Sequence, residues 1–296
     1  MIIERVASRG IVFTFMDLSS EDFECPTNVY VINGDDHFFI CDTFLGPDSM
    51  KPVIDYLEKE FEEKPIVIFN SHAHWDHYWG NCSFPNPLII SHEKTIQIMK
   101  EKGEEELNKY QKFQKGDIQL RFPTILFKEA LSFPKEKIVF FYTPGHTIDS
   151  SSCFDFKDKI LFAADNLESP IPYLSNDDLS PYLSSYKSYQ DLPVEIYIPG
   201  HGPICNDDNL FQQNLEYLKA FPQLPTNFQS HQESREYAII HLNNLMNIGT
   251  SLDHQEKKET ALDYLELAIS FVENSILDTT KYLPKIKEKI AEISGK

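Results

Sequence analysis

The chain has 296 residues, of which 41% are hydrophobic and 13% aromatic, so it can bury a large core and is not an intrinsically disordered protein. Its 27 basic and 46 acidic residues give a net charge of −19, which disfavours nucleic acid and anionic membrane surfaces as partners. The same charge disfavours polyanionic small molecules, unless bound cations create local positive charge.

Cysteine usage points to a reducing compartment. The five cysteines are odd in number, scattered and never closely paired, so they indicate neither a disulfide framework nor a thiolate zinc site. The start of the chain does not have the pattern of a signal peptide, and no apolar run is long enough to span a bilayer. We therefore expect a soluble, cytoplasmic protein without membrane association.

The first hundred residues alternate short β-type runs with turns and helical patterns. Residues 49–64 carry apolar side chains at helical spacing, and Ser91 has the chemistry of an N-cap for a second helix. Strand-like runs occupy residues 11–15, 28–32, 37–40, 66–69 and 87–90. The order strand, helix, strand predicts an α/β protein.

The run at residues 66–69 leads directly into a segment rich in potential metal ligands. Four of them lie within six residues: His72, His74, Asp76 and His77. In an extended backbone, residues at spacing two project to the same side, so His72 and His74 can face one ion. Two isolated histidines would more simply be a surface turn, but four ligands in one short segment at a strand end favour a metal site.

Later strand-like runs also lead into ligand residues. The runs at 138–142, 160–163 and 196–198 precede His146, Asp165 and His201, respectively. Asp42 follows the run at 37–40 and has the chemistry of an outer acceptor for a ligand. Because neighbouring strands that end at one sheet edge bring their following residues together, we expect these side chains to converge.

Beyond His201 the pattern becomes helical. Amphipathic spacing predicts helices at residues 209–221, 239–248, 262–276 and, after Pro284, at 286–293. We expect a first domain over residues 1–222 and an α-helical extension over residues 223–296. Periodicity leaves open whether this extension packs on its own chain or forms a homodimer.

Two other regions have open roles. The charged segment 101–124 could be an insertion that borders the site. Tyr173 and Tyr182 lie in a loop after Asp165, where they could line a substrate pocket or serve as packing residues.

Imidazole and carboxylate ligands without nearby cysteines are typical of a hydrolytic zinc site. His72, His74 and His146 can bind one divalent ion and leave a position open. Asp76, His77 and His201 can bind a second ion, and Asp165 can bridge the two. The expected cofactors are therefore two divalent metal ions, first of all Zn²⁺, with iron or manganese as alternatives.

Two such ions supply a nucleophile. They lower the pKa of a shared water from about 15.7 to roughly 7, so that a metal-bridging hydroxide can attack a polarised carbonyl or phosphoryl centre. Asp76 is the candidate catalytic residue, because it can orient the hydroxide and carry its proton onward.

These motifs resemble the metallo-β-lactamase superfamily over roughly the first 220 residues. The resemblance implies an αββα sandwich with the dimetal site at one edge of two sheets, a catalytic domain over residues 1–222, and Asp42 as a supporting aspartate. All seven usual ligands are present. Two departures occur: Ala164 stands where a glycine commonly precedes the bridging aspartate, and Ile148-Asp149 stands where proline and glycine are frequent.

The presence of Asp165 favours some of the reactions that the resemblance implies over others. Superfamily members that hydrolyse β-lactams generally lack the bridging aspartate, so hydrolysis of these antibiotics is expected to be weak or absent. Thioesterases of the glyoxalase II type, lactonases and phosphodiesterases are more similar in their ligands. We predict a dinuclear metal-dependent hydrolase of a small ester, thioester or lactone. The alternatives are a phosphodiesterase and a diiron redox or nitric-oxide-handling protein.

Overall fold

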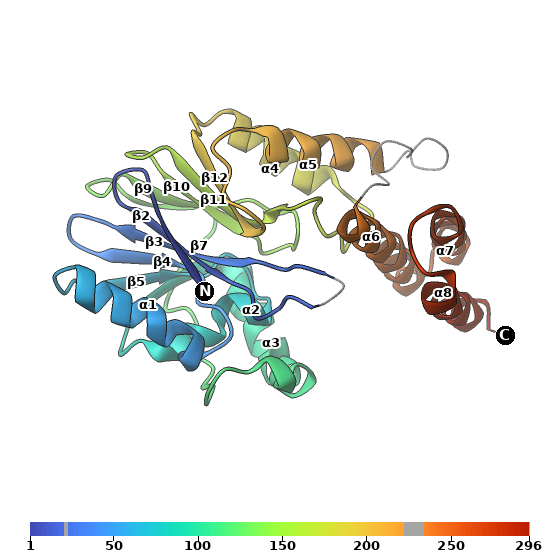
Figure 1. The fold of residues 1–296 in the computed structure, drawn as a ribbon, viewed down its shortest axis with the longest axis horizontal. Helices are drawn as coiled ribbons and strands as arrows, with labels where there is room; N and C mark the ends of the chain where they lie inside the picture. The colour runs from blue at the N-terminus through green and yellow to red at the C-terminus, as the bar shows by residue number, and fades with distance from the viewer. Residues whose placement is uncertain (21–22, 222–233, 296) are drawn as a thin grey trace.

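The computed structural model describes residues 1–20, 23–221 and 234–295 (Figure 1). Within these ranges twelve strands pair into one continuous sheet. The strands are β1 (Ile2–Val6), β2 (Gly10–Phe15), β3 (Thr27–Asn33), β4 (Phe38–Cys41), β5 (Ile66–Phe69), β6 (Leu88–His92), β7 (Ile125–Phe127), β8 (Ala130–Phe133), β9 (Ile138–Tyr142), β10 (Ser151–Asp155), β11 (Ile160–Glu168) and β12 (Ile196–His201). The helices are α1 (Pro47–Glu60), α2 (Trp75–Tyr78), α3 (Glu93–Lys109), α4 (Ser180–Gln190), α5 (Asn209–Ala220), α6 (Arg235–His254), α7 (Lys258–Asn274) and α8 (Thr279–Ser294), with short 3-10 turns η1 (Trp79–Ser83) and η2 (Gln111–Phe113).

The sheet folds into two layers that face each other (Figure 1). One layer contains β1 to β7, antiparallel from β1 to β4 and parallel from β4 to β7. The other contains β8 to β12, in which only β11 and β12 pair in parallel. The layers join where Thr27 of β3 pairs with His201 of β12. With α1 to α3 on one outer face and α4 and α5 on the other, the predicted αββα sandwich is confirmed.

Apolar side chains fill the interfaces between these layers. Between the two layers of strands, Phe69 of β5 stacks on Phe140 of β9 with ring centroids 4.4 Å apart. Val53 of α1 packs into the core under the first layer. Tyr186 of α4 stacks on Phe211 of α5, with centroids 4.7 Å apart, over the second layer. Because most strands are buried on both faces of the sheet, their sequences are nearly continuous apolar runs.

The C-terminal helices share the core of the second layer. Side chains of α6, α7 and α8, such as Leu242, Leu265 and Ile286, belong to the same buried cluster as Leu161 of β11. Residues 222–233, where the predicted domain boundary falls, lie outside the described residues. In the described part of the chain, none of the helices combines the length and the hydropathy needed to cross a bilayer. The homodimer through these helices stays a prediction.

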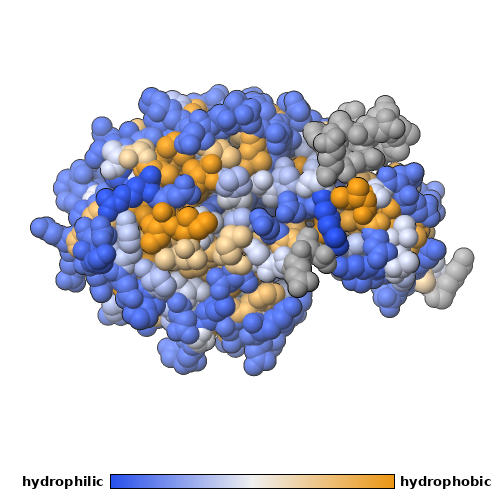
Figure 2. Space-filling model, in the orientation of Figure 1, coloured by the Kyte–Doolittle hydropathy of each residue, from blue (hydrophilic) through white to orange (hydrophobic). Residues whose placement is uncertain are grey.

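The molecular surface agrees with the strongly charged composition. The face seen in Figure 2 is largely hydrophilic, with hydrophobic side chains gathered in separate patches over the sandwich and over the C-terminal helices. Single apolar residues at a surface are normal, since polar atoms cannot cover a whole protein.

Two predicted helix starts were wrong. Ser91 is the fourth residue of β6, and the N-cap of α3 is His92, whose Nδ1 accepts a hydrogen bond from the Lys94 N–H at 3.3 Å. Pro284 does not precede the last helix but lies inside α8, which Asp278 caps through the Thr280 N–H at 2.8 Å. In both cases a side chain nearer the actual start satisfies the free N–H groups.

The elements outside the predicted set include β1, β8, β10, α2 and α4. Strand β10 is fully buried yet contains serines, and Ser152 exchanges a 2.8 Å hydrogen bond with Thr143. Helix α4 is rich in serine and tyrosine, and it buries the tyrosines at 182, 186 and 189 on one face. Tertiary contacts decide these elements, because their residues have weak local preferences.

A buried ion pair lies at the end of the sandwich opposite the turns that follow β5 and β9. Arg9, between β1 and β2, donates from Nε to Asp155 Oδ2 at 2.9 Å and from Nη2 to Asp155 Oδ1 at 2.6 Å. Nη2 also donates to the carbonyl of Glu136. Both side chains of the pair are nearly inaccessible to solvent.

We predict that Arg9→Met destabilises the protein by about 3–5 kcal/mol, because it leaves the Asp155 carboxylate buried without its cation. Denaturant unfolding of the two proteins measures the difference. The matched control is Arg5→Met, which removes an exposed pair with Glu60 and should change stability little. Equal effects of the two substitutions would contradict the role given to Arg9.

Candidate metal centre

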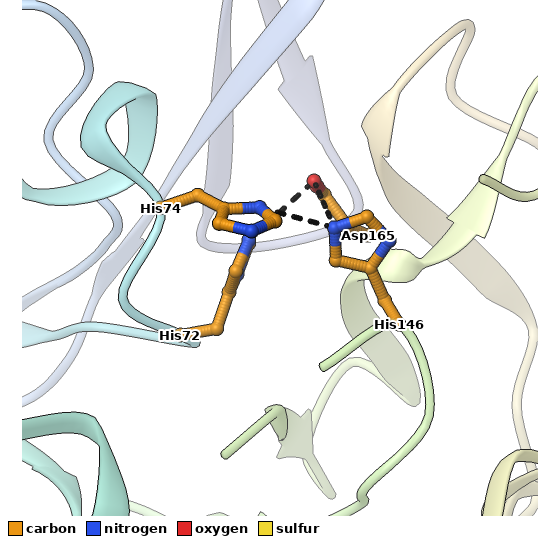
Figure 3. Close-up of side chains that lie close together, drawn as sticks. All are labelled: His72, His74, His146 and Asp165. Carbon is orange, nitrogen blue, oxygen red and sulfur yellow. Dashed lines mark hydrogen bonds and ion pairs between the residues drawn. The ribbon is translucent and has the colours of Figure 1, made fainter. Parts of the chain in front are cut away.

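All seven residues predicted as ligands come together at the edge where the two layers meet. Their donor atoms form two groups, within each of which the atoms lie within 4.8 Å of one another. The first group is His72, His74, His146 and Asp165 (Figure 3). The second group is Asp76, His77 and His201. The sequence thus predicted which side chains converge.

In the first group, side chains from both layers point toward one another (Figure 3). His74 Nδ1 lies 3.1 Å from His146 Nε2. Asp165 Oδ2 lies 3.6 Å from His72 Nε2 and 3.6 Å from His146 Nε2. His72 and His74 follow β5, whereas His146 follows β9, so the group exists only when the sandwich is closed.

The second group shares Asp165 with the first. His77 Nε2 lies 3.7 Å from Asp76 Oδ2 and 3.3 Å from Asp165 Oδ1. His201 Nε2 lies 3.5 Å from Asp76 Oδ2 and 3.5 Å from Asp165 Oδ2. The carboxylate of Asp165 therefore faces imidazole nitrogens of both groups, which is the geometry required of a bridging ligand.

These donors fit divalent metal ions. Bonds of roughly 2.0–2.2 Å in a tetrahedral site place neighbouring donor atoms about 3.3–3.6 Å apart, close to the separations found in both groups. Three donor atoms are buried without an aligned hydrogen-bond partner among the described residues: His72 Nε2, His77 Nε2 and Asp165 Oδ1. Buried polar atoms normally have partners, so their convergence indicates that a cation completes the site.

Asp165 departs from the predicted arrangement, since it lies inside a strand and not after its end. β11 continues to Glu168, and its pairing with β12 shifts register around Ala164. Ala164 has φ of 48°, a left-handed conformation that costs an alanine about 1–2 kcal/mol. This conformation accounts for the glycine that the resemblance leads one to expect there. The irregular strand turns the Asp165 carboxylate toward the histidines.

Gly200 leaves the space that this carboxylate occupies. A Cβ atom at Gly200 would collide with Oδ1 of Asp165 and approach its backbone N to 2.9 Å. Gly145, next to His146, is similarly enclosed by Tyr182 and Asn166. The glycines beside two of the histidines are thus required for close approach of backbone and side chains.

Asp42 supports two of the imidazoles at once. Its Oδ2 lies 2.8 Å from His77 Nδ1 and accepts a 2.7 Å hydrogen bond from the Ser71 hydroxyl, while Oδ1 accepts from the Ser71 N–H. Since the Ser71 hydroxyl donates to Asp42, its oxygen is free to accept from His72 Nδ1, 2.9 Å away. A proton held on each Nδ1 leaves Nε2 as the metal-facing lone pair.

His201 and His146 have outer partners as well. His201 Nδ1 lies 3.1 Å from Thr27 Oγ1 and 3.4 Å from Cys25 Sγ. His146 Nδ1 lies 3.4 Å from the carbonyl oxygen of Tyr173, which can only accept. Four of the five imidazoles therefore turn Nδ1 outward to an acceptor and Nε2 inward.

Glu168 is a component of the site that the sequence reading missed. Its side chain is 2% exposed, its Oε2 lies 3.8 Å from His146 Nδ1, and it forms a cluster of possible ligand atoms with Asp165 and His201. Burial and the nearby charge of Asp165 raise the pKa of Glu168 well above its ordinary value. Its spacing of three residues from Asp165 was the only signal, and that spacing has no special meaning in a regular strand.

The tyrosines of α4 hold the strand that bears Asp165. The Tyr182 hydroxyl donates to the carbonyl oxygen of Asp165 at 3.0 Å, and Tyr186 donates to that of Asn166 at 2.7 Å. Asn166 in turn accepts a hydrogen bond from the His146 N–H at 2.9 Å. Because Tyr182 is 1% exposed, it is a packing residue and does not line a substrate pocket, whereas Tyr173 is half-buried.

The segment 101–124 does border the site. It contains the end of α3 and η2, from which Tyr110 and Phe113 stack on Trp75 with ring centroids 4.7 and 5.2 Å apart. Trp75 stands between His74 and Asp76, so this stacking fixes the turn that carries the first ligands. His92 is structural, since it caps α3 and stacks on Tyr142 with ring centroids 4.0 Å apart.

Burial and charge divide the histidines into two kinds. Burial holds the pKa of His72 well below its ordinary value and lowers the pKa of His146 to about 4, so both are neutral and able to bind metal. Burial also opposes charge on His77, but Asp165, Asp76 and Asp42 outweigh it and raise the pKa of His77 well above the ordinary value. Burial likewise opposes charge on His201, but Cys25 and Asp165 outweigh it and raise the pKa of His201 well above the ordinary value. Without a cation, protons balance the carboxylates on this side.

Fold and side chains together define a class: an α/β sandwich with a histidine and carboxylate metal centre at the junction of its layers. A sequence model described as the metallo-beta-lactamase superfamily matches residues 22–201, which include all seven converging residues. The chain belongs to this superfamily, whose members are largely metal-dependent hydrolases.

Two known proteins are distantly similar in sequence to the chain. The beta-lactamase-like protein 2 homolog of Caenorhabditis elegans is 26% identical over 177 residues, which are 59% of this chain and 50% of that protein. The chain thus spans half the length of this relative. The metallo-beta-lactamase type 2 of Bacillus sp. (strain 170) is 25% identical over 205 residues, 66% of this chain and 73% of that one.

Solved structures support the same fold. A metallo-beta-lactamase from Pontibacter korlensis superposes with a TM-score of 0.58 at 16% identity, and the match covers 74% of this chain and 98% of the Pontibacter chain. One from Hirschia baltica superposes with a TM-score of 0.57 at 17% identity, covering 73% and 96%. At these identities the comparison establishes the fold alone.

We predict that Asp42→Ala lowers the affinity for Zn²⁺ by about 10–100-fold, because His77 and His72 lose the acceptor that orients them. Competition with a chromophoric chelator measures this affinity. Asp55→Ala, which removes an exposed carboxylate paired with Lys51, should leave it unchanged. An Asp42→Ala protein that binds Zn²⁺ as tightly as the wild type would exclude the supporting role.

Metal affinity should also rise with pH. Because the raised pKa values of His77 and His201 keep both protonated near neutrality, a cation must displace those protons, and binding strengthens by about tenfold per pH unit for each proton displaced. His146, with its pKa of about 4, should not compete in this range. Chelator competition at pH 6 and pH 8, corrected for the protonation of the chelator, gives the slope. Equal affinities would contradict the charge assignment.

Proposed function

We propose that this protein is a dinuclear metal-dependent hydrolase of a small ester, thioester or lactone. The observation that carries the proposal is the position of Asp165, whose two oxygens face imidazoles of both donor groups at 3.3–3.6 Å. His72, His74 and His146 would hold one ion. Asp76, His77 and His201 would hold the other. When bound, such ions acidify a water and polarise a carbonyl.

The open side of the site determines which residues can meet substrate. Within the site, His72 and His77 are fully buried, whereas His74 and His201 are partly exposed. Asp76 is 8% exposed, more than the 4% of Asp165. We therefore assign to the carboxylate of Asp76 the task of orienting the attacking water and holding the proton that it releases. Trp75 and its stacking partners keep Asp76 in place.

Charge favours a substrate without anionic groups near the reacting bond. The buried carboxylates of Asp42, Asp76 and Asp165 lie in or beside the site. Among the described residues, the hydrogen-bond and ion-pair partners of the seven site residues include neither lysine nor arginine. A neutral acyl group is thus easier to accommodate than a phosphodiester or the carboxylate of a β-lactam. This is the support for an ester, thioester or lactone.

The test combines elemental analysis with a substrate panel. We expect about two divalent metal ions per chain, with zinc predominant, and hydrolysis of members of the ester, thioester and lactone classes. Asp165→Ala and His146→Ala should each lower that hydrolysis by about 100-fold or more, since each removes a donor from the first group. His254→Ala, at the exposed end of α6, is the control and should keep full activity.

Several outcomes would reject the proposal. A metal-free, folded preparation that still turns over substrate would rule out the metal-dependent mechanism. Two bound irons with redox activity and no hydrolysis would favour the diiron alternative. Hydrolysis confined to phosphodiesters or β-lactams would retain the metal site but reject the proposed substrate class.

A further inference from the structure

The segment Pro172–Leu174 lies between the C-terminal helix α6 and the metal centre. It follows β11, which carries Asp165, and Tyr173 within it reaches His146 through a backbone carbonyl. In Figure 1, α6 lies beside the second layer. What holds this segment therefore bears on the position of a residue in the first donor group.

Asn244 of α6 holds the segment on both sides of Tyr173. Its Nδ2 donates to the carbonyl of Pro172 at 2.9 Å, and its Oδ1 accepts from the Leu174 N–H at 2.8 Å. Nδ2 also donates to the Tyr217 hydroxyl at 2.9 Å. The side chain of Asn244 is completely buried. An amide in such a place is costly unless it is satisfied, and here both of its ends are used.

The Tyr173 peptide continues the connection into the site. Its N–H donates to Glu168 Oε2 at 2.7 Å, and its carbonyl oxygen lies 3.4 Å from His146 Nδ1. Because a carbonyl can only accept, this contact requires the proton of His146 on Nδ1. That tautomer leaves the Nε2 lone pair directed at His74 Nδ1 and Asp165 Oδ2, where the first ion would bind.

We propose that Asn244 is a positioning residue for the metal centre: by fixing the Tyr173 peptide, it sets the orientation and tautomer of His146. The proposal rests on the metal site of the proposed function. It gives the C-terminal helical region a specific role, since a side chain 98 positions beyond His146 in the chain tunes that ligand. Glu168 holds the same peptide from the strand side.

The experiment compares two neighbouring substitutions on α6. Asn244→Leu removes the hydrogen bonds to the segment and keeps a side chain of similar size. Leu245→Ala truncates a side chain that is 2% exposed, so it weakens the packing of the same helix but leaves the hydrogen bonds. For each protein, thermal melting gives stability, chelator competition gives the Zn²⁺ affinity, and the visible spectrum of the Co²⁺-loaded form reports ligand geometry.

We expect Asn244→Leu to bind Zn²⁺ about 10-fold or more weakly and to alter the Co²⁺ spectrum, while Leu245→Ala retains both properties at a comparable loss of stability. Unchanged affinity in Asn244→Leu, or equal losses in both variants, would overturn the proposal. A wild-type protein that binds no metal would instead refute the proposed function itself.

If Asn244→Leu does not fold, Asn247→Ala decides the question. Asn247 has an exposed side chain that donates to the carbonyl of Leu174 at 3.3 Å, so its removal loosens the same segment without disturbing the core. A smaller loss of Zn²⁺ affinity in the same direction supports the proposal, and an unchanged affinity overturns it.

Discussion

The structure depends on one buried carboxylate that several imidazoles share. Asp165 is 4% exposed and has His72, His77, His146 and His201 around its two oxygens. Such a group is stable in the interior only if positive charge compensates it. Protons on His77 and His201 supply that charge in the metal-free protein, and cations can replace them. The irregular β11, Gly200 and the Tyr182 hydroxyl all serve to place this carboxylate.

A second constraint acts on the outer face of the imidazoles. A histidine binds a metal only through a nitrogen that carries no proton, so the other nitrogen needs an acceptor. Asp42 and Ser71 provide acceptors for two ligands, Thr27 for a third and the Tyr173 carbonyl for a fourth. The first three acceptors belong to the first layer, and the fourth belongs to the loop that α6 holds. The ligand set is therefore only the inner part of a network that extends across the molecule.

Parts of this network could be predicted where a short stretch of sequence carries the pattern, and not where residues meet only in the folded chain. Most strands and all seven converging residues could, because an apolar run that leads into histidine or aspartate is visible within ten residues. Asp165 was expected at a strand end, but its register shift around Ala164 is set by the partner strand β12. Glu168 and Asn244 could not be predicted, since their roles come from residues that meet only in the folded chain. Serine-rich β10 and α4 escaped detection for the same reason.

The partly exposed residues at the site bear on substrate selection. The ligands fix the type of chemistry, whereas His74, His201 and the neighbouring Tyr173 are partly exposed. The backbone of Tyr173 orients His146, and burial raises the pKa of its phenol, which therefore stays protonated. A single loop, held by Asn244 and Asn247 of α6, thus links the C-terminal helical region to the position of His146, so changes in that helix can alter the metal centre.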